Sequence, residues 1–172
     1  NGKQNVKMEQ LAVINEAGFG LFCKGSGTNV DVMECCFKKC RYTGMYVCDG
    51  PTATATRCNF MENGHDGVGC AGANTKIRLT DSSVHHNLMD GLYADEHAVV
   101  DLRGTKTDIH SNKTNGILAY ENSKVNIHLP SQHNTTHDNV EEDRFQDGGS
   151  IANINADGTF THVEEVEIDD DH

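Results

Sequence analysis

The feature that most restricts the fold of this chain is a glycine that returns at nearly constant spacing. The copies are 24, 23, 24 and 25 residues apart and lie at Gly20, Gly44, Gly67, Gly91 and Gly116. The residues one and three places after each glycine are small or apolar, as in Leu92 and Ala94. Such alternation is typical of a strand with one buried face. A constant period of this length indicates a solenoid in which equivalent positions stack.

Two further apolar sites recur in every period, and they predict three short strands per coil. One is an alternating pair, such as Ile77 and Leu79, and the other is a single residue seven places before the glycine, such as Phe60 or Val84. A single unit cannot bury its own apolar face, whereas stacked units can. We therefore predict an all-β solenoid of about seven coils of 23–25 residues. Each strand is expected to pair in parallel with its copy in the next coil.

An asparagine column supports the same register. Asn63, Asn87 and Asn112 each lie four residues before a repeat glycine. Stacked amides can hydrogen-bond along the solenoid axis and satisfy backbone groups at a tight corner. We expect the glycines beside them to adopt left-handed backbone angles. The glycosylation sequon at Asn112 is expected to point inward, which leaves Asn134 as the candidate glycosylation site.

The repeat resembles the right-handed parallel β-helix of the pectate-lyase-like superfamily over residues 6–155. The stretches IHLPSQHNTTHDN (127–139) and GGSIANINADGTFTHV (148–163) are also similar to β-helix segments of algal and protist proteins. We expect one β-helix domain over residues 1–162, ending in a hairpin with its turn at residues 156–158, and an acidic C-terminal tail over residues 163–172. The fold by itself implies no activity, because this architecture carries unrelated functions.

Charge and composition exclude several classes of partner. The net charge of −12 argues against a nucleic-acid-binding surface, which needs a basic stripe. No apolar stretch is long enough to insert into a membrane. Because the chain begins at Asn1, we expect it to be processed or part of a longer protein. An extracellular or cell-surface location is slightly favoured.

The seven cysteines lie between residues 23 and 70. We interpret them mainly as small buried apolar residues, and one local disulfide remains an open alternative.

The motifs expected of an enzyme on this architecture are missing. Pectate lyases would carry paired aspartates for calcium and an Arg-x-Pro-x-x-Arg motif, and neither proline of this chain, Pro51 or Pro130, lies in that context. The Asp-Pro-His signature of alginate epimerases is absent too. The coils between residues 20 and 116 also contain no inserted loop that could wall a groove. We therefore predict no cofactor, no metal and, on balance, no enzymatic activity.

Two outward rows remain as candidate ligand-binding surfaces. His85 and His110 each lie six residues before a repeat glycine, and Glu96 and Glu121 lie five residues after one. A histidine–carboxylate set could act in acid–base chemistry or bind a metal or another ligand, but duplication of a surface residue along with the rest of the repeat is the favoured explanation of the column. The column would continue at His133 if Asn139 replaces the corner glycine.

The second row contains Tyr46 and Tyr93, which are each two residues after their glycine. Exposed aromatic rings could stack on sugars or on a partner protein, or could be covered by a loop.

Two classes of function follow from these observations. The favoured one is a non-enzymatic scaffold or interaction module that self-associates or belongs to a larger assembly, because uncapped coils expose strand edges. Contact is expected through the N-terminal end or the Tyr46–Tyr93 face. The alternative is a carbohydrate-binding or carbohydrate-active module related to polysaccharide lyases and epimerases. The expected partner is therefore a protein or a polysaccharide.

Overall fold

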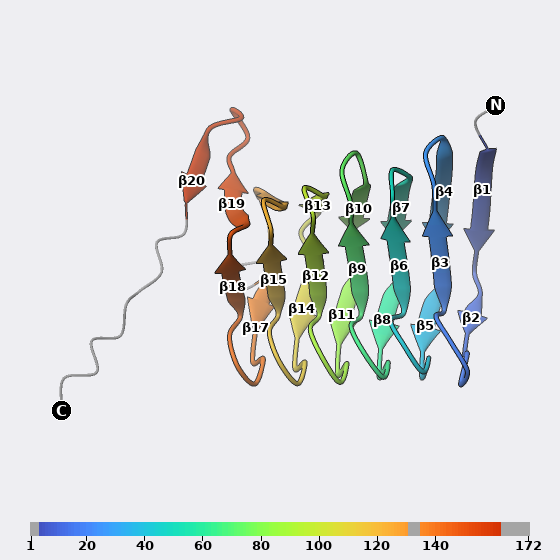
Figure 1. The fold of residues 1–172 in the computed structure, drawn as a ribbon. Helices are drawn as coiled ribbons and strands as arrows, with labels where there is room; N and C mark the ends of the chain where they lie inside the picture. The colour runs from blue at the N-terminus through green and yellow to red at the C-terminus, as the bar shows by residue number, and fades with distance from the viewer. Residues whose placement is uncertain (1–3, 131–134, 163–172) are drawn as a thin grey trace.

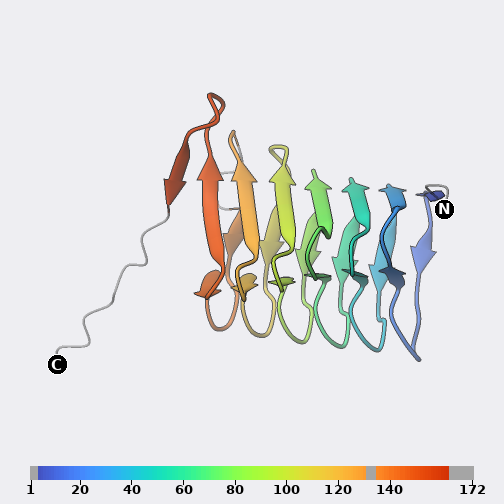
Figure 2. The same cartoon turned by 45° about the horizontal axis from the view of Figure 1, so that its top comes forward.

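A computed structural model describes residues 4–130 and 135–162 of the chain. These residues form strands and turns and contain no helix. The strands assemble into three sheets that run the length of a solenoid (Figure 1 and Figure 2). Successive strands of the chain belong to sheets A, B and C in turn, so that every third strand returns to the same sheet.

Sheet A has eight strands, which are β1 (Gln4–Glu9), β4 (Thr28–Met33), β7 (Thr52–Thr56), β10 (Lys76–Thr80), β13 (Val99–Arg103), β16 (Lys124–His128), β19 (Ser150–Ile154) and β20 (Phe160–His162). Sheet B has six strands, which are β2 (Ala12–Val13), β5 (Cys36–Lys38), β8 (Asn59–Met61), β11 (Ser83–His85), β14 (Asp108–His110) and β17 (Thr136–His137). Sheet C also has six strands, which are β3 (Leu21–Lys24), β6 (Met45–Cys48), β9 (Val68–Ala71), β12 (Leu92–Asp95), β15 (Ile117–Tyr120) and β18 (Arg144–Asp147).

The described residues form six coils that place a strand in all three sheets, and β19 adds a seventh parallel strand to sheet A. The all-β solenoid is therefore confirmed, at about six turns, close to the predicted seven. The last strand, β20, pairs antiparallel with β19 across the turn at residues 156–158, which confirms the expected hairpin. The predicted acidic tail, residues 163–172, lies outside the described residues.

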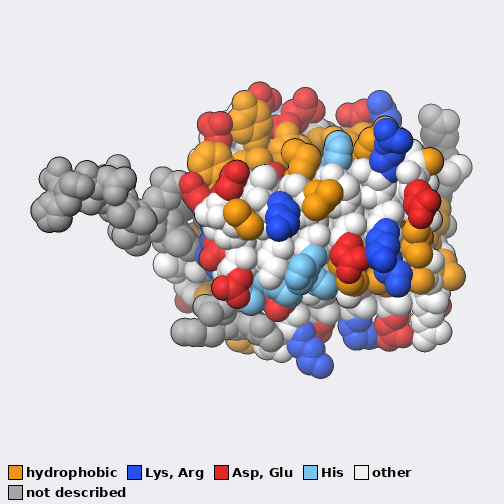
Figure 3. All heavy atoms as spheres, turned by 90° about the horizontal axis from the view of Figure 1, so that it is seen from below, with side chains coloured by type: hydrophobic (Ala, Val, Ile, Leu, Met, Phe, Trp, Pro, Cys, Tyr) orange, Lys and Arg blue, Asp and Glu red, His pale blue; other side chains and the backbone are white. Residues whose placement is uncertain are grey.

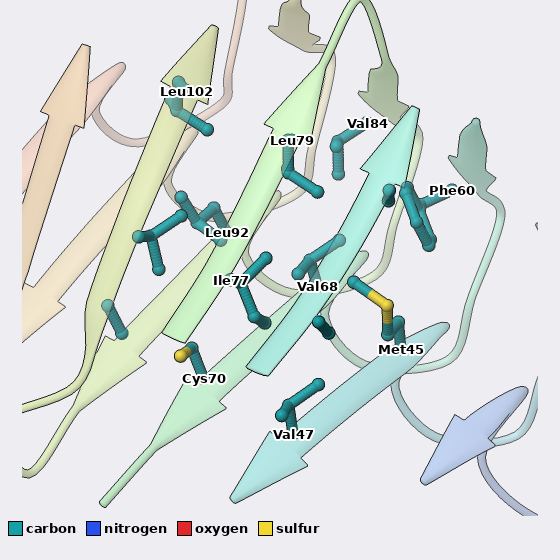
Figure 4. Close-up of a cluster of buried hydrophobic side chains, with 14 of the residues drawn as sticks. Met45, Val47, Phe60, Val68, Cys70, Ile77, Leu79, Val84, Leu92 and Leu102 are labelled. Atoms are coloured by element: carbon teal, nitrogen blue, oxygen red, sulfur yellow. The ribbon is translucent and has the colours of Figure 1, made fainter. Parts of the chain in front are cut away.

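The core is a set of columns in which the same coil position stacks from one coil to the next. Phe37 and Phe60 are fully buried and their rings stack with centroids 5.2 Å apart. Leu79 pairs with Ala55 on one side and Leu102 on the other. Figure 4 shows labelled core side chains from all three sheets, such as Phe60, Leu79 and Leu92, converging on the solenoid interior. Because each coil is buried by its two neighbours, the apolar alternation in the sequence maps directly onto this interior.

All seven cysteines are free, so the open possibility of a local disulfide is not realised in the structure. Six are buried, and Cys36 is half-buried. Burial raises the pKa of the Cys70 thiol to about 12, which keeps this thiol protonated at neutral pH. The cysteines therefore behave as small apolar core residues.

The expectation of left-handed angles at the repeat glycines is wrong. None of the five has a φ in that region; instead, the chain bends through single non-glycine residues such as Arg57 and Glu62, whose φ values are 51° and 54°. The glycines are required by close packing. A Cβ on Gly91 would lie 2.5 Å from Ile109 Cγ2, 2.6 Å from Asn112 Nδ2 and 2.7 Å from the carbonyl oxygen of Gly116. The glycine thus leaves room for the next coil rather than for an unusual backbone angle.

Candidate functional site

The asparagine column forms a continuous hydrogen-bonded ladder inside the corner that precedes sheet C. Asn63, Asn87 and Asn112 have no exposed surface. The Nδ2 group of Asn63 donates to Asn87 Oδ1 at 3.0 Å, and Asn87 Nδ2 donates to Asn112 Oδ1 at 2.9 Å. Asn112 donates in turn to Asn139 Oδ1 at 2.9 Å. These amides hold the coils in register, and Asn139 occupies an asparagine position, not the glycine position expected for it.

The histidine column lies on the outer face of sheet B. His85 and His110 are paired in neighbouring strands, and their rings are parallel with centroids 4.9 Å apart. His137 continues the column, with its ring 5.1 Å from that of His110. The predicted member, His133, lies outside the described residues. The sequence prediction assigned Asn139 to the position of the repeat glycine, whereas the structure places it in the asparagine column, four residues earlier in the repeat. The predicted next histidine was therefore His133 instead of His137.

A fourth imidazole, from His86, was missed because its turn position gives no strand pattern in the sequence. Its ring stands edge-on to His85, with centroids 5.0 Å apart and the two Nδ1 atoms 2.7 Å apart. Figure 3 shows histidine side chains gathered on one face of the solenoid. Three successive coils thus bring four imidazoles together.

Burial lowers the pKa of His85, and the neighbouring His110 lowers it further. Burial also lowers the pKa of His110. In contrast, a hydrogen bond from Nδ1 to Asp138 raises the pKa of His137, whose Nε2 lies 3.0 Å from Asp108. At neutral pH, the column therefore begins with neutral rings and ends in a histidine–carboxylate pair.

The two glutamates do not join this cluster. Glu96 and Glu121 follow the ends of β12 and β15, at the corner between sheets C and A, and both have a positive φ. Among the described residues, no hydrogen bond or ion pair connects either glutamate with His85 or His110. Nor do any three histidine, cysteine, aspartate or glutamate side chains of this part of the chain stand arranged to hold a metal ion. The predicted acid–base set is consequently split, with its histidines on the outer face of sheet B and its glutamates at the corner between sheets C and A.

The aromatic row lies on the outer face of sheet C. Phe22 pairs with Tyr46, and their rings are nearly parallel with centroids 6.0 Å apart. Phe19 packs against both rings. Tyr46 extends over Gly69, where a Cβ would lie 2.5 Å from its ring, so that Gly69 separates it from Tyr93. The row is therefore split into an aromatic cluster near the N-terminal end and an isolated Tyr93.

Tyr93 has a local role. Its hydroxyl donates a hydrogen bond to Asp95 Oδ2 at 2.5 Å, and burial together with this carboxylate raises its pKa. Burial likewise raises the pKa of Tyr46. Both phenols are therefore neutral at physiological pH and can contribute apolar contact and hydrogen bonds, but no charge.

Two carboxylates, Asp66 and Asp90, stack at the corner before sheet C. Asp90 is buried, and its Oδ1 accepts hydrogen bonds from the backbone N–H and the side-chain amide of Asn115, both at 2.9 Å. Asp66, one coil earlier, is half-buried and accepts one from the Asp90 N–H at 3.1 Å. Burial and then the charge of Asp90 raise the pKa of the Asp66 carboxyl from 3.8 to about 6.

Asp66→Asn is expected to stabilise the protein at pH 7 by about 1–3 kcal/mol. Because folding raises this carboxyl pKa, the folded protein holds the proton more tightly than the unfolded chain, and Asp66 lowers stability as the pH rises from about 4 to about 6. The stability that Asp66→Asn gains over the wild type should therefore be present above pH 6 and vanish below pH 4. Urea denaturation at both pH values tests this, with the exposed Asp31→Asn as the charge-matched control. An equal gain at pH 3.5 and pH 7 would contradict the explanation.

Two remaining points concern the surface of the chain. The candidate glycosylation residue Asn134 lies outside the described residues, while Asn112 is buried in the ladder, as its place in the asparagine column predicted. No helix among the described residues is long and apolar enough to cross a membrane.

Comparison with known proteins adds one finding. A family model of the right-handed β-helix region matches residues 1–82. The three-sheet pattern continues without a break through the described coils that follow, as far as β19. No curated protein and no solved structure matches the chain significantly.

Proposed function

The chain is a right-handed parallel β-helix repeat protein, and we propose that it works as a non-enzymatic assembly module that associates through its N-terminal end. The observation that supports this proposal is an exposed apolar surface on the first coil. Val6 and Leu11 are 44% and 48% exposed, although their register equivalents in the next coil, Val30 and Cys35, are buried. These are core positions that lack the neighbour every later coil has.

The two ends of the solenoid differ in how their edges are covered. β1, β2 and β3 are the terminal strands of sheets A, B and C, and no described strand pairs with their outer edges. At the other end, β20 pairs with β19 and covers the terminal edge of sheet A. Open parallel edges with exposed core residues favour pairing with another polypeptide. The N-terminal end is therefore the preferred contact surface.

Sedimentation velocity at micromolar concentration tests this proposal. We expect the chain to sediment as a dimer or larger species, and Leu11→Lys to shift it to monomer, because a lysine at an open edge opposes strand pairing. Leu88→Lys makes the same substitution at an exposed turn residue and should leave the assembly unchanged. A wild-type monomer over the whole concentration range would contradict self-association, as would equal effects of the two variants.

The aromatic cluster of Phe19, Phe22 and Tyr46 supports carbohydrate binding as a second candidate. Phe22 is 51% exposed and nearly parallel to Tyr46, and flat aromatic faces stack on the apolar faces of sugar rings. Titration with a soluble oligosaccharide, followed by tyrosine fluorescence in the wild type and in Phe22→Ala, separates this candidate from the assembly module.

A further inference from the structure

Two imidazoles of the histidine cluster meet through the same ring nitrogen. Nδ1 of His85 lies 2.7 Å from Nδ1 of His86. This contact is a hydrogen bond only if one ring donates its N–H and the other accepts with a free lone pair. When both rings are protonated, two N–H groups face each other and the contact becomes repulsive. The geometry of this pair therefore requires that at least one of the two rings is neutral.

A third ring, that of His110, packs against both of these histidines. It is parallel to His85 with centroids 4.9 Å apart, and it stands edge-on to His86 at 5.9 Å. Its other face stacks on His137 at 5.1 Å. Like charges at this separation repel each other, and partly buried positions are screened less than bulk water would screen them. The stacked column is therefore stable only while most of its rings are neutral.

The carboxylates nearest to the column gather at its His137 end. Asp108 Oδ1 lies 3.0 Å from Nε2 of His137, and Asp138 Oδ2 lies 2.8 Å from Nδ1 of the same ring. Asp108 Oδ2 is 3.9 Å from Nε2 of His110, which is too far for a hydrogen bond. A positive charge on His137 is thus compensated by two hydrogen-bonded carboxylates, whereas a charge on His110 is not.

The opposite end of the column has less compensation. On β8, the strand that precedes β11 in sheet B, the residue paired with His85 is the uncharged Met61. Glu62 follows it and contributes to the field at His85, but its carboxylate forms an ion pair with Lys39 at 3.7 Å. Among the described residues, no carboxylate is hydrogen-bonded to the ring of His85 or to that of His86.

We propose that His85, His86 and His110 form an acid-sensitive lock on sheet B. Neutral rings hold β11 and β14 together, and protonation of the rings forces the two strands apart at their outer face. In these two coils β11 and β14 share three residue pairs, whereas β10 and β13 share five in sheet A. The shorter pairing is the weaker link, so the opening is expected to be confined to sheet B.

The direction of the pH dependence follows from the environment of each ring. Burial and then the neighbouring His110 lower the pKa of His85, and burial lowers the pKa of His110. Because the unfolded chain binds these protons more readily, the stability that the two rings contribute is complete well above pH 6.5 and is lost as the pH falls below it. His137 has the opposite effect: the hydrogen bond to Asp138 raises its pKa, so its contribution is complete below pH 6.5 and is lost as the pH rises through its folded pKa.

Urea denaturation of the full chain at pH 7.5 and pH 5.5 tests the lock. We expect acidification to lower the urea midpoint of the wild type relative to that of His110→Gln, because the variant lacks one of these rings and its effect on His85. His97→Gln is the control, since His97 is exposed and has no ring contact with the column. Its midpoint should keep the same offset from the wild type at both pH values. A constant offset for His110→Gln as well would overturn the proposal.

Hydrogen exchange shows whether the opening is local. The Asp108 N–H donates to the Ser82 carbonyl in sheet B, and the Val99 N–H donates to the Thr75 carbonyl in sheet A of the same two coils. After correction for the intrinsic effect of pH on exchange, we expect the protection of the Asp108 amide at pH 5.5 to fall relative to that of Val99. Equal changes at the two amides would overturn the proposal, because they would mean that acid acts on the whole solenoid and not on sheet B.

Discussion

Replacing Gly91 with valine is expected to lower the free energy of unfolding by about 3 kcal/mol or more. A Cβ at this position would lie 2.5–2.7 Å from Ile109, Asn112 and the Gly116 carbonyl. Two of these atoms belong to buried side chains and the third to the backbone of the next coil, so none of them can move away freely. The clash would separate coils that are held together by the hydrogen bond from Leu92 N–H to the Gly116 carbonyl. Urea denaturation followed by circular dichroism measures the loss.

Gly18→Val is the control for this experiment. A Cβ on Gly18 would meet only the side chain of Asn15, at 3.2 Å, and its φ also lies outside the left-handed region. The valine there should cost much less, because the half-buried Asn15 side chain has to shift by only a few tenths of an ångström and no backbone atom stands in the way. If Gly91→Val and Gly18→Val unfold at the same urea concentration, the close approach between coils is not the reason for the glycine column.

The fold could be predicted because a solenoid converts sequence period into spatial stacking. Residues 24 positions apart, such as Asn63 and Asn87, become direct neighbours, so a column in the alignment of repeats is a column in space. The same logic located the ladder and the outward histidines. It does not distinguish two reasons why a glycine recurs in every coil: a left-handed backbone angle, or the absence of space for a Cβ atom against the next coil. The second depends on where the Asn112 and Ile109 side chains lie in the next coil.

The errors at the candidate site have a similar origin. Asn112 and Asn139 are adjacent in the ladder although they are 27 residues apart, because the chain between β16 and β17 is longer than in the earlier coils. A prediction based on constant coil length therefore named His133 as the next member of the histidine column, whereas the structure has His137 there. The raised pKa of Asp66 could not be predicted either, since it depends on how deeply the corner is buried and on the distance to Asp90.

Replacing Asn87 with leucine is the second substitution expected to have a large effect. Asn87 accepts hydrogen bonds from the backbone N–H and the Nδ2 group of Asn63, and it donates to the Phe60 carbonyl at 3.1 Å and to Asn112 Oδ1. All of these groups are buried, and leucine leaves them without their partner at about 1–3 kcal/mol for each unsatisfied group. We expect a loss of about 3–5 kcal/mol in the free energy of unfolding. Asn29→Leu, which removes a solvent-accessible amide contact with Asn5, should cost less than about 1 kcal/mol.

A double-mutant cycle with Asn63→Leu shows whether the ladder itself is the cause. If the cost of Asn87→Leu comes largely from the unsatisfied amide of Asn63, removing that amide as well should restore part of the stability. The double variant is then expected to be more stable than the sum of the single losses predicts, by at least about 1 kcal/mol. Strict additivity would mean that each asparagine stabilises the fold through its own hydrogen bond to the backbone, from Asn63 to the Phe37 carbonyl and from Asn87 to the Phe60 carbonyl. The hydrogen bonds between asparagine side chains along the solenoid axis would then contribute little.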